Sequence, residues 1–384
     1  MTRGARVAKN AYLAAHRFGI SFRNPRALIA NCGSGPIPAI ASRILILIGS
    51  MRSHGGAWVR KAVAFATLAL AAHWAFAQPA ATTCETVAAC VDQLRFGETR
   101  PAREMAARVL GERGDPSALA VLANALKNDS GEFVRINAAE ALGRLRLPGA
   151  IEPLVQSLKA EPLEQVRSAI AASLSRLGGE QAATALAGTL AEDADYGVRQ
   201  QAAISLGVIG LAASAEALGE ALEGDGRREV RIAAAQALGR LQGGNTVEPL
   251  AAALKDDADA SVRATAATAL SKPRAAEQEK PAADALIAAL GKDKDPDVRR
   301  AIARALNQRK EEAAVLPLIS ALRGDASIEV RQEAAWALGA IGNDAARQAL
   351  RYYAKNSIYP QIRRVCADAL DERFSPRSPP AAAK

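Results

Sequence analysis

The sequence predicts an all-α fold, an α-solenoid of about eight 32-residue helical hairpins with a half-unit at each end. Its first indication is a Val-Arg pair, or a close equivalent such as Ala102-Arg103, that recurs nine times. The spacing is 32 residues throughout, except for one step of 36 residues between Val262 and Val298. A fixed period of this length indicates a repeat architecture in which each unit is one supersecondary element.

Two columns of residues support the same register. With the first residue of each pair as position 0, position +5 is Ala and position +8 is Leu in all nine units. Positions 0, +4, +5 and +8 are apolar or small almost throughout, which is the stripe of an amphipathic helix. We expect the Ala column to let neighbouring helices approach one another closely.

A second helix is predicted after a turn such as "GRLRLPGA" (143–150). It carries Leu at positions +20 and +24, as at Leu154 and Leu158. A hairpin of this size cannot enclose its own core, so stacking of neighbouring units has to bury the Leu columns.

The period also divides the chain. Residues 78–101 are predicted to form an N-terminal capping helix segment, residues 102–372 the repeat solenoid, and residues 373–384 a disordered tail. The four extra residues of the sixth unit are expected in a longer polar loop at 271–281.

The segment 51–77 has the features of a secretory signal peptide. Basic residues precede an uncharged apolar run at 62–72, and the small residues Ala75 and Ala77 mark a cleavage site before Gln78. The alternative is an uncleaved N-terminal membrane anchor, for which the run is short. Residues 1–50 are then interpreted as a non-native extension upstream of a true start at Met51, or as disordered; the rival is a mitochondrial transit peptide, because such peptides are also Arg-rich and poor in acids.

The leader also determines the charge of the chain. The formal net charge is +9, but ten of the 49 basic residues and none of the 40 acidic residues precede Gln78, which leaves a net charge of −1. All three histidines, His16, His54 and His73, lie in the same segment. The basic overall composition is therefore no argument for nucleic-acid binding.

An acidic residue lies six positions before most of the repeated arginines. Because guanidinium groups are well suited to bridging a carboxylate between stacked turns, we interpret the row as a structural ladder rather than a ligand-binding site. The arginines of this ladder are Arg135, Arg167, Arg199, Arg231, Arg263, Arg299 and Arg331. Ser357 interrupts the acidic series before Arg363.

The alternation of "VRxxAAxALG" with "AxxPLxxAL", and Asp before Val-Arg, resembles HEAT repeats of the short bacterial phycobilisome-lyase-like type. The resemblance covers residues 84 to 372 and implies an α-solenoid with an extended binding surface. Relatives include deoxyhypusine hydroxylase, which binds iron through His-Glu pairs, but no histidine follows residue 77 to carry that site over. Nothing in the sequence marks a bilin pocket.

The cysteines predict no metal site. Cys84 and Cys90 lie six residues apart and could not bridge on one continuous helix, because their side chains would point in different directions. A disulfide requires Cys84 to precede the helix and fold back, and both possibilities stay open. Cys366 occupies the +4 column and is expected to be a small buried residue.

Two candidate contact surfaces remain. Aromatic side chains in columns that should face solvent are typical of a binding hot spot, or else they cover the last unit. These residues are Trp336, Tyr352, Tyr353 and Tyr359. A row of acids on the second helices would suit a basic partner, or else it is a solvated face. That row contains Glu152, Glu216, Glu248 and Asp284.

Together these features predict a non-catalytic protein-binding scaffold or assembly module in the bacterial periplasm. We expect no cofactor, no nucleic-acid partner and no membrane insertion after cleavage; the protein partner and the oligomeric state are not identified by the sequence. The alternative is an enzyme or enzyme subunit of the HEAT-like lyase and hydroxylase group.

Overall fold

The computed structural model describes residues 84–272 and 276–371. The predicted extension at 1–50, the signal peptide at 51–77 and the tail at 373–384 lie outside the described residues. The described residues all belong to one compact unit, Thr82–Lys384. Its described residues form α-helices and short 3-10 helices without any strand, which confirms the predicted all-α solenoid.

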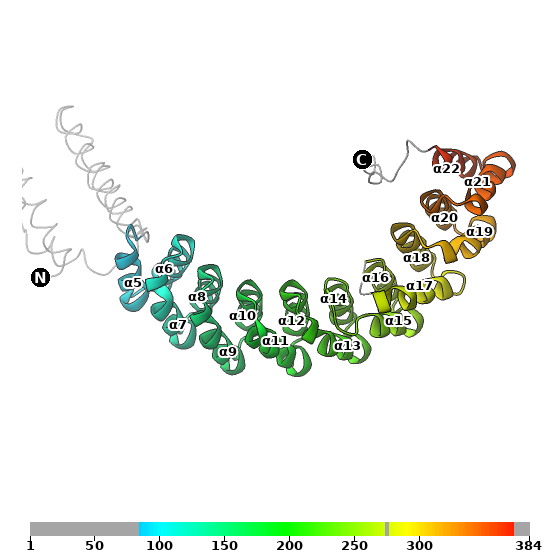
Figure 1. Cartoon of the computed structure of the whole chain (residues 1–384). Helices are drawn as coiled ribbons and strands as arrows, with labels where there is room; N and C mark the ends of the chain where they lie inside the picture. Colours follow the sequence, from blue (N-terminus) through cyan, green and yellow to red (C-terminus); the bar gives the residue numbers. More distant parts are fainter. Residues whose placement is uncertain (1–83, 273–275, 372–384) are drawn as a thin grey trace, which may run out of the picture. The chain divides into compact units, whose positions relative to one another are not determined.

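Each repeat contributes one first helix, which begins near the Val-Arg pair. The first helices lie side by side along one face of a single row (Figure 1). They are α6 (Arg100–Arg113), α8 (Glu132–Leu145), α10 (Glu164–Leu177), α12 (Tyr196–Ile209), α14 (Arg228–Leu238), α16 (Ala260–Leu270), α18 (Pro296–Arg309), α20 (Ile328–Ile341) and α22 (Pro360–Leu370).

The second helices form the other face of the row (Figure 1). They are α5 (Val87–Phe96), α7 (Leu119–Asn128), α9 (Ile151–Ala160), α11 (Glu180–Glu192), α13 (Ala215–Gly224), α15 (Val247–Asp256), α17 (Ala276–Leu290), α19 (Val315–Gly324) and α21 (Asp344–Asn356). Short 3-10 turns lead into four of them: η1 (Pro116–Ala118), η2 (Pro148–Ala150), η3 (Ala212–Ser214) and η4 (Glu312–Ala314).

Four of the nine first helices begin with a polar capping residue three positions before the Val-Arg pair. The side chain of Asp195 accepts a hydrogen bond from the backbone N–H of Val198 at 3.1 Å and caps α12. Asp259, Asp295 and Ser327 cap α16, α18 and α20 in the same way. An N-cap oxygen satisfies one of the free N–H groups at a helix start, so the starts of these four helices are set locally.

Neighbouring first helices approach one another more closely than neighbouring second helices do. The Ala columns and a recurring Gly at position +9 explain this difference. A Cβ atom on Gly207 of α12 would lie 2.8 Å from the Cα of Ala237 in α14, and one on Gly143 would lie 2.9 Å from the Cβ of Ser173. Larger residues at these positions would push the helices apart.

The Leu columns form a continuous core along the row. Leu174, Leu206 and Leu238 at position +8 are fully buried, and so are Leu154 and Leu186 of the second helices. Burial of a Leu side chain contributes about 1.5–3 kcal/mol. Since each repeat contacts mainly its neighbours, stability is distributed along the array.

The inserted residues differ from the expectation of a polar loop at 271–281. Residues from Ala276 onward are helical, so the insertion lengthens the beginning of α17. Arg309 of α18 donates hydrogen bonds to the backbone carbonyl of Leu270 and to the carbonyl and carboxylate of Glu279. The longer helix is therefore tied to the following repeat by a side chain.

The N-terminal end of the described chain is fixed by a disulfide. Cys84 precedes α5, whose N-cap is Thr86, and its sulfur is bonded to that of Cys90 with a Cα–Cα distance of 5.0 Å. Cys90 and Leu94 are buried where α5 meets α6. The bridge forms because the chain turns before the helix, which is the arrangement that a pair six residues apart requires.

Candidate functional site

The principal polar feature of the described solenoid is a ladder of arginines at position +1. In Arg167, Nε and Nη2 donate to the Asp193 carboxylate at 2.7 and 2.9 Å, and Nη1 donates to the backbone carbonyl of Glu161 at 3.1 Å. Asp193 also accepts from the backbone N–H of Asp195 at 2.9 Å. Each guanidinium therefore joins the turn before its own helix to the turn before the next first helix.

The ladder has seven rungs with this geometry among the described residues. They are Arg103–Asp129, Arg135–Glu161, Arg167–Asp193, Arg199–Asp225, Arg231–Asp257, Arg263–Asp293 and Arg299–Asp325. The paired carboxylate belongs to the next repeat, whereas the residue six positions before the arginine contributes its carbonyl oxygen. Sequence reasoning missed Arg103 because Gly97 precedes it by six residues; the acid 26 residues later was the informative signal.

The ladder changes at the last repeat. Arg331 donates to the backbone carbonyl of Asp325, but Ser357 stands where the next carboxylate would be. The Arg331 guanidinium instead lies over the Tyr359 ring, 4.8 Å from its centroid. A cation–π contact thus replaces the ion pair at this end of the solenoid.

In five of the rungs the pKa of the carboxylate is lowered. Burial opposes ionisation of Asp193, yet the pKa of Asp193 is lowered, because hydrogen bonds from Arg167 and from the backbone N–H of Asp195, with the charges of Arg167 and Arg199, outweigh burial. The same balance lowers the pKa of Asp129, Asp225, Asp293 and Asp325. Groups that satisfy one another in this way are structural, and they offer no free acid or base for catalysis.

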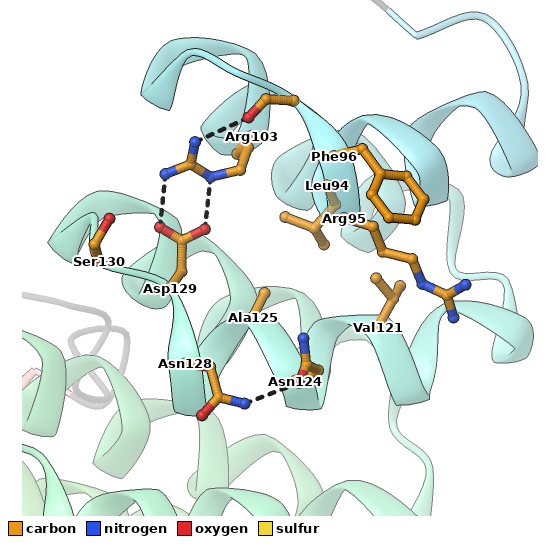
Figure 2. Close-up of a pocket in the computed structure, with 11 residues that line it drawn as sticks. Leu94, Arg95, Phe96, Arg103, Val121, Asn124, Ala125, Asn128, Asp129 and Ser130 are labelled. Carbon is orange, nitrogen blue, oxygen red and sulfur yellow. Dashed lines mark hydrogen bonds and ion pairs between the residues drawn. The ribbon is translucent and has the colours of Figure 1, made fainter.

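A shallow pocket lies beside the first rung, between α5 and α7 (Figure 2). Its volume is about 440 Å³, and its lining includes Phe96, which is 75% exposed. Two pairs of polar groups in it are already joined: Arg103 with Asp129, and the Asn128 amide with the Asn124 side-chain oxygen at 2.8 Å. The side chains of Arg95 and Ser130 also line the pocket and have no such partner among the described residues. The pocket is a polar depression of the surface rather than an assembled catalytic centre.

A second depression of about 470 Å³ lies farther along the same edge. It is lined by Arg227, Arg228 and Asp259, and Arg228 pairs with Asp259 at 3.4 Å. The neighbouring Tyr196 is exposed, and the Arg227 guanidinium lies 4.2 Å from its ring centroid. Sequence reasoning missed Tyr196, because it is the first residue of α12, two positions before the Val-Arg pair and outside the columns that were compared.

The predicted aromatic patch is divided among different surfaces. Trp336 is half-buried on α20, a first helix, whereas Tyr352 is exposed on α21, a second helix. Tyr353 packs against the core, and its ring meets that of Tyr352 edge-on at 5.1 Å. Burial raises the pKa of Tyr353. Tyr359 is the N-cap of α22, and its ring contacts Arg331 of the ladder. The four residues therefore form no single contact site.

The predicted acidic row lies on exposed positions of the second helices. Glu152 accepts from Gln156 and Gln181, Glu248 accepts from Asn245, and Asp284 pairs with Lys280. Thr184 stands at the equivalent position between Glu152 and Glu216 and interrupts the row. Leu316, which is 76% exposed, stands at the equivalent position after Asp284 and ends it. Glu216 is exposed on α13. The acids therefore form local polar contacts rather than a continuous charged surface.

Metal binding, membrane crossing and cysteine reactivity can each be assessed for the residues that the structure describes. No three His, Cys, Asp or Glu side chains among them are grouped so that they could hold a metal ion. Within the same ranges, no helix combines the length and the apolar character needed to cross a bilayer. The Cys366 thiol is buried, and burial raises its pKa to about 12, so it is a poor nucleophile.

Stacked helical hairpins with a side-chain ladder between successive repeats define an α-solenoid repeat protein. The family model described as HEAT repeats matches residues 87–175, 183–271, 215–307 and 283–371. The chain therefore belongs to the HEAT-repeat family, as its sequence pattern predicted.

Several solved structures are similar to this chain. Human deoxyhypusine hydroxylase is 25% identical over 68% of this chain and 96% of its own, with a TM-score of 0.31. CpcE and CpcF of phycocyanin lyase from Nostoc are 22% identical over 72% and 95%, with a TM-score of 0.33. Importin beta is 15% identical over 100% and 57%, with a TM-score of 0.50. No match was found among curated proteins.

Proposed function

We propose that the protein is a non-catalytic, protein-binding scaffold or assembly module exported to the bacterial periplasm. The observation that carries the proposal is that the polar side chains between the repeats are paired with one another. The arginine and carboxylate side chains of the ladder bind one another between repeats and hold the hairpins in register, which leaves a long, firmly positioned surface for display. Solenoids of stacked repeats use such extended surfaces for binding.

Two features support the exported location. The segment 51–77, which lies outside the described residues, has the order of basic, apolar and small residues that is typical of a signal peptide. The bond between Cys84 and Cys90 suits an oxidising compartment, because structural disulfides persist there and are rare in the cytosol.

The proposal is tested by purifying the full chain, with a C-terminal tag, from cross-linked cells of its own host. We expect one protein partner at a constant molar ratio and a purified complex without visible absorbance. A stoichiometric bilin, iron or other chromophore bound to the chain would overturn the non-catalytic function and favour the enzyme alternative.

A further inference from the structure

An unusual part of the first-helix surface lies in the middle of the row. We define the uncharged strip as positions +2, +3 and +6 of α10, α12, α14 and α16. Its twelve residues include no Asp, Glu, Lys or Arg. The same positions carry charges in the flanking repeats, at Glu140 of α8 and at Arg300 and Arg304 of α18. The absence of charge is thus confined to four successive repeats.

The side chains of the uncharged strip combine apolar and amide groups. Ile204 and Ile232 are half-buried and pack against the core, so part of each remains in contact with solvent. The side-chain amides of Gln200 and Gln236 have no hydrogen-bond partner within the described part of the chain. Surfaces that become the centre of a protein interface are depleted of charge, because charged groups are costly to dehydrate.

A row of cations borders the strip at the C-terminal ends of the same helices. Position +10 is Arg176, Val208, Arg240 and Lys272 in the four repeats, and all four residues are exposed. The three cations form no ion pair with another residue that the structure describes. At the opposite edge, the arginines of the ladder are already paired with carboxylates.

From this juxtaposition we propose that the uncharged strip binds an acidic segment of a protein partner. The segment places apolar and uncharged side chains over Ile204 and Ile232, and its carboxylates face the cationic row. Electrostatic complementarity of this kind selects the partner and sets the register in which it binds. The proposal rests on the proposed scaffold function and adds the binding surface and the chemistry of the partner.

The spacing of the cations favours a protein over a nucleic acid. Packed helices lie about 8–10 Å apart, so cations that occur once or less per repeat are separated by that distance or more. A nucleic-acid strand carries one phosphate about every 3.4 Å. Residues 78–384 also have a net charge of −1, which opposes binding of a polyanion.

The test uses site-specific photocross-linking in the native host. A benzophenone amino acid replaces Gln236, an exposed residue of the strip on α14, and, as a matched control, Glu220, an exposed residue of α13 on the second-helix face. We expect an adduct from the Gln236 position and none from the Glu220 position. Sequencing of the linked peptide is expected to show a segment richer in acidic than in basic residues.

Charge reversal provides the second part of the test. Arg176→Glu with Arg240→Glu is expected to reduce the adduct at least about tenfold. Lys127→Glu with Lys159→Glu, the same charge change on α7 and α9, should leave it unchanged. Because cations at helix C-termini also stabilise helices, the thermal midpoint of each variant is measured alongside.

Three outcomes distinguish the proposals. A basic linked segment, or an adduct that survives reversal of Arg176 and Arg240, would overturn the acidic partner. An adduct only from the Glu220 position would overturn the strip but leave the scaffold function standing. Absence of any protein adduct at either position would count against both.

Discussion

Replacing Leu206 by Ala is expected to lower the free energy of unfolding by about 2–5 kcal/mol. Leu206 is fully buried on α12, and its column lies between successive repeats, so truncation leaves a cavity in the shared core. Urea unfolding followed by circular dichroism measures the loss.

Leu316→Ala is the matched control for this experiment. Leu316 is 76% exposed on α19, and the same chemical change there should alter stability by at most about 0.5 kcal/mol. Equal losses from the two variants would contradict a stability that depends on the buried Leu columns.

Removal of one ladder arginine is expected to have the next largest effect. Arg199→Ala leaves the Asp225 carboxylate without its two guanidinium hydrogen bonds of 2.7 and 3.2 Å and removes the bond to the Asp193 carbonyl. A largely buried group left without its partner costs about 1–3 kcal/mol. The free energy of unfolding in urea at neutral pH should fall by that amount.

Two controls identify the ion pair as the cause. Arg331→Ala removes a similar side chain that lies over Tyr359 and has no carboxylate partner among the described residues, so its effect should be smaller.

Acid should also reduce the effect of Arg199→Ala. The pKa of Asp225 is lowered in the folded chain, so the pair's contribution is present above the ordinary Asp pKa of about 3.9 and is lost as pH falls through the lowered pKa. An undiminished difference at low pH would contradict the pairing.

The periodic part of the fold could be predicted because it repeats. Nine copies of the same Ala and Leu positions define the helix faces, and the HEAT-repeat pattern follows from them. The insertion was less predictable, since polar residues such as those before Ala282 suit either a loop or an exposed first turn of a helix. The structure makes them helical from Ala276 onward.

Contacts between repeats were harder to predict than the repeats themselves. The arginines were recognised, but a periodic sequence presents an acid both six residues before and 26 residues after Arg167, and spacing alone does not decide between them. Trp336 and Tyr352 are close in sequence, yet they belong to helices on different faces. Aligning the repeats shows which residues occupy equivalent positions, but it does not show which residues are in contact.

The most direct test of an exported binding scaffold is the N-terminus and intact mass of the protein purified from its own host. The account predicts a chain that begins at Gln78, lacks two hydrogens because Cys84 and Cys90 are bonded, and carries no covalent chromophore. A chain that retains residues 1–50 would contradict export through the 51–77 segment and would restore the basic residues that the account assigns to a leader.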